Sequence, residues 1–499
     1  MIMKLSNIIK CTLLLVSALF YQSCSDSKDG GSATALEVTQ DGVVIDQVSF
    51  AMGEASTMLG VKTDAEWTVS VPDADTTWLS VTPHQGYGWN ITDSTASNYR
   101  SYFKVTAKKN TDAPRTSTLT VTAGGLTKTI QVAQKGISGN LDGHENAWTM
   151  VENFILGYNM GNNLECNPYG SWWDASSKTP KDWETAWGQP EITATTIATL
   201  KAKGFNVIRI PVTWYPHMKK FDEGNYIIDA AWMARVKEVV DMVRAADMYC
   251  IINIQHDAGA NNGSGDAHSA WLHAGSDYET VSVIYKQLWQ QIATTFKDYD
   301  DKLIFESFNE ILNESSSWTA PSAGDVAYTT INKLQQDFVN TVRATGGNNR
   351  YRNLLISTYA DGTTQVCLDE LQVPDDEAVN HLCATFHSYD PYWFCNDSEG
   401  SEDYYINYFG DDQKSEIDAI FQRVDKRCGQ LGIPYFFGEF GAIGSHPAMA
   451  ERAKYADYIT KKFNEYQTAG LYWSGLLDRN TQEWTESEIV DAMVANRVK

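Results

Sequence analysis

The stretch LIFESFNE, residues 303–310, places a nearly continuous apolar run directly before the polar pair Asn309 and Glu310. Such a run predicts a strand that is buried on both faces, as the strands of a parallel sheet are. Seven further runs of this kind alternate with helical segments: ILGYNM (155–160), NVIRIPV (206–212), MYCIINIQ (248–255), NLLIST (353–358), HLCATFHSY (381–389), PYFFGEF (434–440) and LYWSGLLD (471–478). Eight strands in alternation with helices predict an α/β fold, in which residues 140–499 form a (β/α)8 or TIM barrel.

The helices of this barrel are expected between the strands. Residues 414–430 have the period of an amphipathic helix, with apolar side chains that include Ile417, Phe421 and Val424. Further helices are expected at 194–203, 230–246, 282–298, 327–345, 449–468 and 486–498. In a (β/α)8 barrel the chemistry takes place at the carboxyl ends of the strands, so polar residues there are the candidates for a functional site.

An earlier part of the chain, residues 37–136, has a different pattern. Short segments alternate apolar and polar residues with a period of two, and turn-forming residues separate them. This pattern predicts a small all-β, immunoglobulin-like sandwich. The segments are LEVTQ (36–40), WTVSV (67–71), WLSVTP (78–83), YFKVTAKKN (102–110), TSTLTVTAG (116–124) and TKTIQVAQKG (127–136).

Residues 1–24 have the features of a signal peptide. Lys4 and Lys10 give a short basic region, and residues 11–20 (CTLLLVSALF) form an apolar stretch that is too short to cross a bilayer as a helix. The segment ends in a sequence that resembles a bacterial lipobox, so Cys24 is expected to be lipidated and to become the mature amino terminus. Residues 25–36 then form a flexible tether. We expect an exported protein, anchored to the outer membrane and facing the cell surface; an ordinary cleaved signal is the alternative.

The composition limits the possible partners. The 499 residues include 39 Lys and Arg against 63 Asp and Glu, a net charge of −24. Nucleic-acid binding needs a basic surface, so this charge argues against it and against a polyanionic substrate. No Cys or His spacing is typical of a zinc site, and no metal or cofactor is expected. Six cysteines follow Cys24, of which Cys250 and Cys383 lie in apolar runs and are expected to be buried free thiols.

Polar and aromatic residues stand at the carboxyl ends of the predicted barrel strands. Because burial of polar groups costs free energy unless they pair, their convergence on one mouth indicates a site. Glu306 would lie about 13 Å deeper than Glu310, so we expect it to pair with a buried cation. Side chains alternate along a strand, so the backbone must leave regular strand geometry if both Asn309 and Glu310 face the mouth. The strand-end residues are Arg209, His256, Asn309, Glu310, His387, Tyr389, Glu439 and Trp473.

Glu310 and Glu439 lie on opposite sides of this mouth and suit the hydrolysis of a glycosidic bond. One carboxyl group must be protonated to release the leaving group, and the other must be ionised to attack the anomeric carbon. We expect Arg209 and Tyr389 to hold Glu439 as a carboxylate, and this anion to raise the pKa of Glu310. The pair predicts retention of configuration, with carboxyl groups about 5–5.5 Å apart. A structural ion pair between Glu439 and Arg209 is the alternative.

The eight strand-end residues together closely resemble the pattern of glycoside hydrolase family 5. The resemblance covers residues 150–499 and implies a metal-independent enzyme. It implies that Glu310 is the acid/base, that Glu439 is the nucleophile and that Asn309 binds the sugar 2-hydroxyl. It further implies that His387 neighbours Glu310 and that Trp473 is the platform for the −1 sugar.

Three motifs, GYNMGNNLE (157–165), ETAWGQP (184–190) and GFNVIRIPVTW (204–214), further resemble subfamily 4 of this family. The members of subfamily 4 include endo-β-1,4-glucanases, xyloglucanases and lichenases, so a monomeric, endo-acting β-glucan hydrolase of plant polysaccharides is expected. A β-mannanase, a xylanase and a non-catalytic glycan-binding lipoprotein are the alternatives. The sequence departs from the family at Gln255 and Ile311, and from the subfamily at Asn163 and Cys166.

Several tryptophans are candidates for stacking on sugar rings. Trp187 and Trp214 lie inside or beside the motifs above and are expected to line the cleft. For the others, packing within a loop is an equal alternative to sugar contact. These others are Trp172, Trp173, Trp271 and Trp393.

The sandwich resembles the BACON domain, which precedes many exported bacterial glycoside hydrolases. The resemblance lies in Trp67, residues 78–81, residues 115–121 and the closing QVAQK. The family is often proposed to bind carbohydrate, but Trp67 and Trp78 lie on predicted strands, where aromatic side chains more often pack in the core. Trp89, in a predicted loop, is the better binding candidate. We expect the sandwich to act mainly as a spacer.

Overall fold

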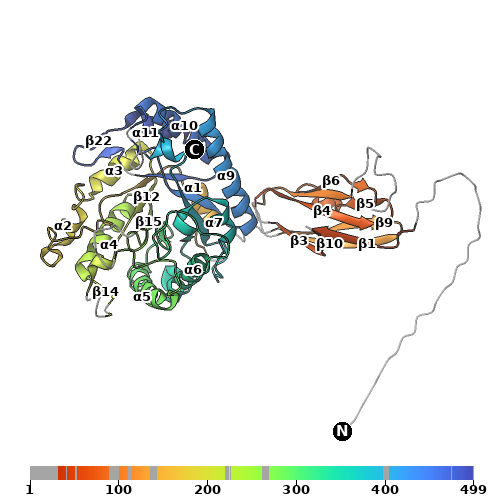
Figure 1. Ribbon diagram of the computed structural model, residues 1–499, viewed down its shortest axis with the longest axis horizontal. Helices are drawn as coiled ribbons and strands as arrows, with labels where there is room; N and C mark the ends of the chain where they lie inside the picture. Colours follow the sequence, from red (N-terminus) through yellow and green to blue (C-terminus); the bar gives the residue numbers. More distant parts are fainter. Residues whose placement is uncertain are drawn as a thin grey trace, which may run out of the picture.

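The computed structural model describes residues 32–40, 42–50, 53–88, 101–110, 115–134, 143–219, 224, 226–260, 269–396, 404–444, 446–473 and 475–497. These residues form a β-sandwich followed by a barrel (Figure 1). The predicted signal peptide with Cys24, and Trp89, lie outside the described residues. Among the described residues, no helix has the length and apolar character that crossing a membrane would require.

The described residues of the amino-terminal part form two five-stranded sheets, which confirms the predicted all-β sandwich and adds strands to the six predicted segments. One sheet has the order β2-β1-β4-β8-β6 and the other β3-β10-β9-β5-β7. Trp67 and Trp78 are 1% and 8% exposed, so both pack in the core between the sheets. The strands are β1 (Leu36–Gln40), β2 (Val43–Val44), β3 (Gln47–Phe50), β4 (Ala55–Thr63), β5 (Trp67–Ser70), β6 (Leu79–Thr82), β7 (Gln85–Gly86), β8 (Tyr102–Ala107), β9 (Arg115–Ala123) and β10 (Leu126–Gln134).

The second part is a closed barrel of eight parallel strands, which confirms the predicted (β/α)8 fold. Nearly every residue of these strands is buried, because side chains pack both in the barrel interior and under the surrounding helices. The strands are β11 (Gly157–Asn159), β12 (Val207–Ile210), β15 (Tyr249–Ile252), β16 (Leu303–Glu306), β17 (Leu354–Ile356), β18 (Leu382–Ser388), β19 (Tyr435–Phe440) and β20 (Gly470–Trp473).

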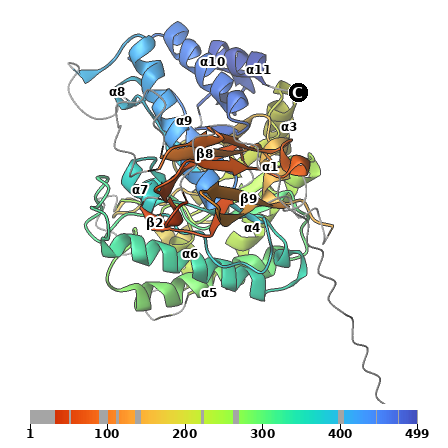
Figure 2. The same cartoon turned by 90° about the vertical axis from the view of Figure 1, so that its right-hand side faces the viewer.

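Helices cover the outside of the barrel, and Figure 2 shows them around the sandwich, which lies in front of the barrel in that view. The helix α3 begins where Thr193 caps it and ends at Gly204, whose φ of 109° is left-handed, so its bounds match the prediction. The short helix α7 covers a connection for which no helix was predicted. The main helices are α3 (Ala194–Lys203), α4 (Ala230–Ala245), α5 (Tyr278–Phe296), α6 (Val326–Ala344), α7 (Gln365–Glu370), α9 (Asp411–Leu431), α10 (Met449–Glu465) and α11 (Ser487–Asn496).

The helix α1 (Ala147–Asn153) closes the amino-terminal end of the barrel. Met150, Val151 and the following Phe154 are buried against the first residues of the strands, and the ring of Phe154 lies 5.0 Å from that of Tyr249. A side-chain hydrogen bond from Lys109 of the sandwich reaches Gln467, just before β20, at this same end. The carboxyl ends of the strands, where the candidate residues lie, therefore open on the side away from this contact.

The six cysteines after Cys24 are all buried free thiols. This confirms the prediction for Cys250 and Cys383, which lie on β15 and β18. Burial raises the pKa of the Cys250 thiol to about 12, so it stays protonated at neutral pH. These cysteines contribute to packing and form no cross-links.

Candidate active site

Arg209, on β12, lies at the centre of a buried hydrogen-bond network. Its Nε and Nη2 donate to the two oxygens of Glu306 at 2.8 and 2.6 Å, and its Nη1 donates to Oε1 of Glu439 at 2.7 Å. Arg209 and Glu306 are both fully buried. The prediction that Glu306 pairs with a buried cation is therefore confirmed. Further hydrogen bonds from the guanidinium reach the amide oxygens of Asn159, Gln255 and Asn309.

Glu439, on β19, receives a hydrogen bond on each carboxylate oxygen. Arg209 donates to Oε1, and the hydroxyl of Tyr389 donates to Oε2 at 2.6 Å. Burial, with the nearby charge of Glu439, raises the pKa of Tyr389 well above its ordinary value, so Tyr389 keeps the proton that it donates. The cation and the two hydrogen bonds stabilise the negative charge of Glu439, as the sequence led us to expect.

Glu310 lies beyond the end of β16 in an unusual backbone conformation. Its φ is 31°, in the left-handed region that non-glycine residues rarely adopt. The backbone therefore leaves strand geometry here, and Asn309 Nδ2 lies 3.5 Å from Glu310 Oε2. The backbone N–H of Glu310 donates to Oδ2 of Asp361 at 2.5 Å. Asp361 belongs to the turn after β17, and sequence reasoning missed it.

His387, on β18, lies between three carboxyl groups. Its Nδ1 is 2.9 Å from Glu310 Oε1 and 3.6 Å from Glu439 Oε2. Its Nε2 is 3.7 Å from Oδ2 of Asp361. Burial would lower the pKa of His387, but the charges of Glu439 and Asp361 and the hydrogen bond with Glu310 raise it to about 9. His387 is therefore protonated at neutral pH.

The expected pKa shift of Glu310 was wrong in direction. Burial alone would raise this pKa, but the hydrogen bond and charge of His387, with the charges of Arg209 and His256, lower it below its ordinary value. The prediction considered only the anion of Glu439 and overlooked the imidazolium between the two carboxyl groups. Glu310 and His387 are a coupled pair that titrates as a unit, in which the pKa of His387 is raised and that of Glu310 is lowered.

The two candidate catalytic carboxyl groups lie close together. An oxygen of Glu310, an oxygen of Glu439 and a ring nitrogen of His387 all lie within 4.8 Å of one another. A retaining glycosidase has its carboxyl groups about 5–5.5 Å apart, whereas an inverting enzyme separates them by about 6.5–9.5 Å to admit a water molecule. The geometry therefore favours direct attack by one of the carboxylates.

Trp473 ends β20 and lies against Gly161. A Cβ at Gly161 would come within 3.1 Å of the indole ring, so this glycine leaves the space that the indole occupies. Close to it, burial raises the pKa of Glu165 to about 7, and the carboxylate of Glu165 accepts hydrogen bonds from the backbone of Asn162 and Asn163. The side chain at the end of the eighth strand is thus held at the mouth by the loop after β11.

A cleft of about 360 Å³ opens beside Glu310. Asn309, Glu310 and His256 contribute to its lining, together with three aromatic side chains. Burial lowers the pKa of His256 to about 4, so this imidazole is neutral. The aromatic side chains are Tyr169, Trp187 and Trp318, which are 45%, 39% and 58% exposed.

Trp187 therefore lies where it was predicted, but Trp214 does not. Trp214 is fully buried, and its indole N–H donates to the backbone oxygen of Asn253 at 2.9 Å. The prediction for Trp214 rested only on its position beside a motif, and it was wrong because the indole points into the core. Tyr169 and Trp318 were missed because isolated aromatics in loops carry no sequence signal of their own.

The remaining tryptophans differ in their surroundings. Trp271 is 8% exposed and donates a hydrogen bond to Asp257 at 2.7 Å, so it packs within the domain. Trp173 packs against Trp183. Trp393 stacks on Tyr404, whereas Trp172 is 69% exposed.

The residues that depart from the family pattern are hydrogen-bonded or buried. Gln255 accepts hydrogen bonds from Arg209 and Asn253, and so takes part in the network below Glu439. The Asn163 amide donates to two backbone oxygens and accepts from Arg479. Ile311 is fully buried.

Two family models match the chain. Residues 169–475 match the model described as Cellulase (glycosyl hydrolase family 5). Residues 65–135 match the BACON model, described as a putative binding domain. The two matches correspond to the barrel and the sandwich.

Individual proteins are also similar. Endoglucanase A of Clostridium longisporum is 31% identical over 69% of this chain, and the chain spans 65% of its length, slightly less than two thirds. The xyloglucan-specific endo-beta-1,4-glucanase BoGH5A of Bacteroides ovatus is 28% identical, with 94% of this chain and 92% of that protein aligned. A structure of PbGH5A from Prevotella bryantii, in complex with a xyloglucan tetradecasaccharide, superposes with a TM-score of 0.63 at 36% identity, over 71% of this chain and 99% of that one.

Proposed function

The chain belongs to glycosyl hydrolase family 5, and from this premise we propose that it is a retaining, endo-acting β-1,4-glucan hydrolase. One observation carries the proposal: Glu310 and Glu439 lie within 4.8 Å of each other and of His387. The charge of Arg209 and the hydrogen bond from Tyr389 stabilise Glu439 as a carboxylate, the form that can attack the anomeric carbon.

In the first step Glu439 attacks the anomeric carbon. A bond forms between a carboxylate oxygen and that carbon while the glycosidic C–O bond breaks. The leaving oxygen takes the proton that the His387–Glu310 pair carries, through Glu310 Oε1, which lies 2.9 Å from His387 Nδ1. The products of this step are a glycosyl ester on Glu439 and a free sugar hydroxyl.

In the second step water hydrolyses the ester. The Glu310–His387 pair takes a proton from the water as its oxygen attacks the anomeric carbon, and the ester bond to Glu439 breaks. The proton returns to the pair, Glu439 becomes a carboxylate again, and the two inversions give overall retention.

Other residues position the substrate in this proposal. Asn309 has its amide oxygen occupied by Arg209, at 2.9 Å, which leaves its amide N–H groups directed toward the sugar 2-hydroxyl. Trp473 forms the platform of the −1 sugar. The cleft beside Glu310, with Tyr169, Trp187 and Trp318, accepts the sugars of the leaving group.

Xyloglucan is the first substrate to test, because the relative that aligns with both domains is named xyloglucan-specific. We also propose that lipidation of Cys24 anchors the protein to the outer membrane, with the sandwich as a spacer. The contact of Lys109 with Gln467 supports this role, because it lies at the barrel end away from the cleft. Release of a Cys24→Ala variant from the membrane fraction would support the anchor, and retention there would refute it.

The enzyme activity is tested on xyloglucan, mixed-linkage β-glucan, cellulose, glucomannan and xylan, with sizing of the products. Large early fragments are expected from an endo-acting enzyme. NMR of the first-formed product should show the β-anomer, and an initial α-anomer would exclude the double displacement.

A further inference from the structure

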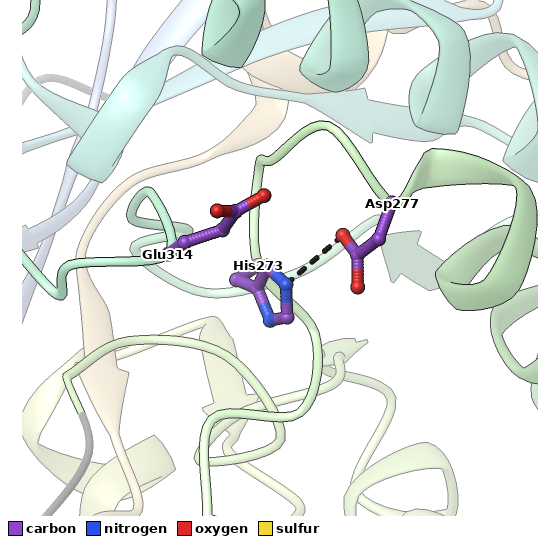
Figure 3. Close-up of side chains that lie close together, drawn as sticks. All are labelled: His273, Asp277 and Glu314. Atoms are coloured by element: carbon purple, nitrogen blue, oxygen red, sulfur yellow. Dashed lines mark hydrogen bonds and ion pairs between the residues drawn. The ribbon is translucent and has the colours of Figure 1, made fainter.

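Two loops at the carboxyl end of the barrel bring together three side chains of types that can coordinate a metal, outside the candidate catalytic site. His273 and Asp277 belong to the loop between β15 and α5, and Glu314 belongs to the loop after β16 (Figure 3). A parallel β-bridge between Ala274 and Asn313 joins these two loops. Side chains from both loops therefore meet in a fixed relationship.

The donor atoms of the three side chains are close to one another. A ring nitrogen of His273 and one oxygen each of Asp277 and Glu314 all lie within 4.8 Å, and His273 Nε2 is 3.0 Å from Asp277 Oδ1. Ligands of a tetrahedral Zn²⁺ ion lie roughly 3.3 Å apart, since the metal–ligand distances are about 2.0–2.2 Å. Small rotations of these partly exposed side chains would bring the three donors to that separation.

Hydrogen bonds from Ser276 hold the carboxylate of Glu314 near His273 and Asp277. No lysine or arginine among the described residues pairs with that carboxylate. Its Oε1 accepts hydrogen bonds from the backbone N–H and the hydroxyl of Ser276, at 2.7 and 3.0 Å. Within the part of the chain that the structure describes, neither Glu314 nor Asp277 forms an ion pair with a lysine or arginine. Among the described residues, the imidazole of His273 is thus the nearest group of either carboxylate that can carry a positive charge.

We propose that His273, Asp277 and Glu314 form a Zn²⁺ site. One imidazole nitrogen and two carboxylate oxygens are a donor set that Zn²⁺ accepts, with water in the fourth position. Ca²⁺ and Mg²⁺ prefer ligand sets made only of oxygen, so the histidine selects against them. His273 and Asp277 are four residues apart, but Glu314 lies 37 residues further along the chain, so only the pairing of the two loops brings the third donor to the other two.

Along the sequence, one residue of this site lies close to residues of the catalytic cleft. Glu314 stands between Glu310 and Trp318, both of which line the cleft. A bound ion would connect the loop that carries these residues to the loop before α5. Because an ion that binds only the folded protein stabilises it by mass action, Zn²⁺ should raise the melting temperature.

The test is a titration of metal-free, untagged protein with zinc chloride, followed by isothermal titration calorimetry and thermal unfolding. We expect one Zn²⁺ per chain at this site and a melting temperature that rises with Zn²⁺ concentration. His273→Gln and Glu314→Gln should each weaken binding by at least about 100-fold and abolish the rise. Calcium chloride should have no such effect.

Two control variants separate this site from other places where Zn²⁺ could bind. Glu439→Gln disrupts the catalytic cluster, whose donors are similarly close, and should leave the stabilisation unchanged. His144→Gln alters a histidine paired with the single carboxylate of Asp301 and should also leave it unchanged. The proposal is overturned if Zn²⁺ does not bind below about 1 mM, if binding survives both His273→Gln and Glu314→Gln, or if Ca²⁺ binds equally well.

Discussion

The backbone amide of Glu310 donates a 2.5 Å hydrogen bond to the side chain of Asp361, which follows the neighbouring barrel strand. Both residues have positive φ angles, 31° and 51°. A second hydrogen bond, from the hydroxyl of Ser357, holds the other oxygen of Asp361. Strained backbone conformations persist only where the surroundings enforce them, so Asp361 keeps Glu310 in its position.

Asp361 is therefore predicted to be a positioning residue. Asp361→Leu removes the acceptor and should lower kcat by roughly 100-fold with little change in KM, because Glu310 loses its alignment. Asp361→Asn keeps an acceptor oxygen and should retain most of the activity. Kinetics on a soluble β-glucan, with melting temperatures as a check on folding, measure both. Equal losses in the two variants would contradict the positioning role.

The roles of Glu310 and Glu439 can be distinguished by the leaving group. Glu439→Ala should lose at least about 10³-fold in kcat on every substrate, because no nucleophile remains. Glu310→Ala should lose about 10²–10⁴-fold on polysaccharide. On a dinitrophenyl β-glycoside, whose leaving group needs no proton, Glu310→Ala should instead show a rapid burst of dinitrophenol followed by slow turnover. A burst from Glu439→Ala would reverse the assignment.

The pH dependence should follow the His387–Glu310 pair. The pKa of His387 is raised to about 9, so the pair keeps its transferable proton below that pH and loses it above. The alkaline limb of kcat/KM should therefore lie near pH 9. In His387→Asn only the Glu310 carboxyl carries the proton, and the limb should move to lower pH. A pH–rate profile of the two proteins on one substrate tests this, and an unmoved limb would exclude His387 as the proton carrier.

Most of the fold could be predicted from the sequence because the barrel depends on simple patterns. Apolar runs such as that ending at Glu306 can be buried only in a sheet covered on both faces. The deep position of Glu306 followed from strand geometry alone, and its pairing with Arg209 agrees with that depth. Because the carboxyl ends of all eight barrel strands lie at the same end of the barrel, the barrel topology also predicted that the strand-end residues meet at one mouth.

The errors concern properties that depend on three-dimensional surroundings. Trp214 lies beyond the end of β12, where the alternation of side chains along a strand no longer predicts their direction. Its indole faces the core. Asp361 lies in an irregular turn, so no pattern pointed to it. The pKa of Glu310 depends on His387, and only the structure shows that this imidazole lies between the carboxyl groups of Glu310 and Glu439.

Trp187 and Trp214 should differ sharply on substitution. Trp187→Ala removes a half-exposed ring from the cleft and should raise KM for polysaccharide by about two- to tenfold, with the melting temperature unchanged. Trp214→Ala leaves a cavity and an unpaired carbonyl in the core, and should destabilise the barrel by about 3–5 kcal/mol. Chemical denaturation and kinetics on xyloglucan measure both effects. A Trp214→Ala variant that is as stable as the wild type but has a raised KM would contradict the core position and show that Trp214 lines the cleft.

The buried pair of Arg209 and Glu306 should link stability to catalysis. Glu306→Gln leaves the guanidinium with one carboxylate partner instead of two and should destabilise the barrel by about 3–5 kcal/mol. It should also lower kcat, because Arg209 can then move away from Glu439, which it now holds at 2.7 Å.

The pair of Glu184 and Arg235 provides a matched control, since Glu184 is fully buried and lies 2.7 Å from Arg235, a residue of the helix α4. Glu184→Gln should therefore cost a similar amount of stability and leave kcat nearly unchanged. Urea denaturation and turnover, measured on both variants, test the link. If Glu306→Gln lowers stability but leaves kcat like that of Glu184→Gln, Arg209 serves only as a structural cation, and another group must stabilise the charge of Glu439.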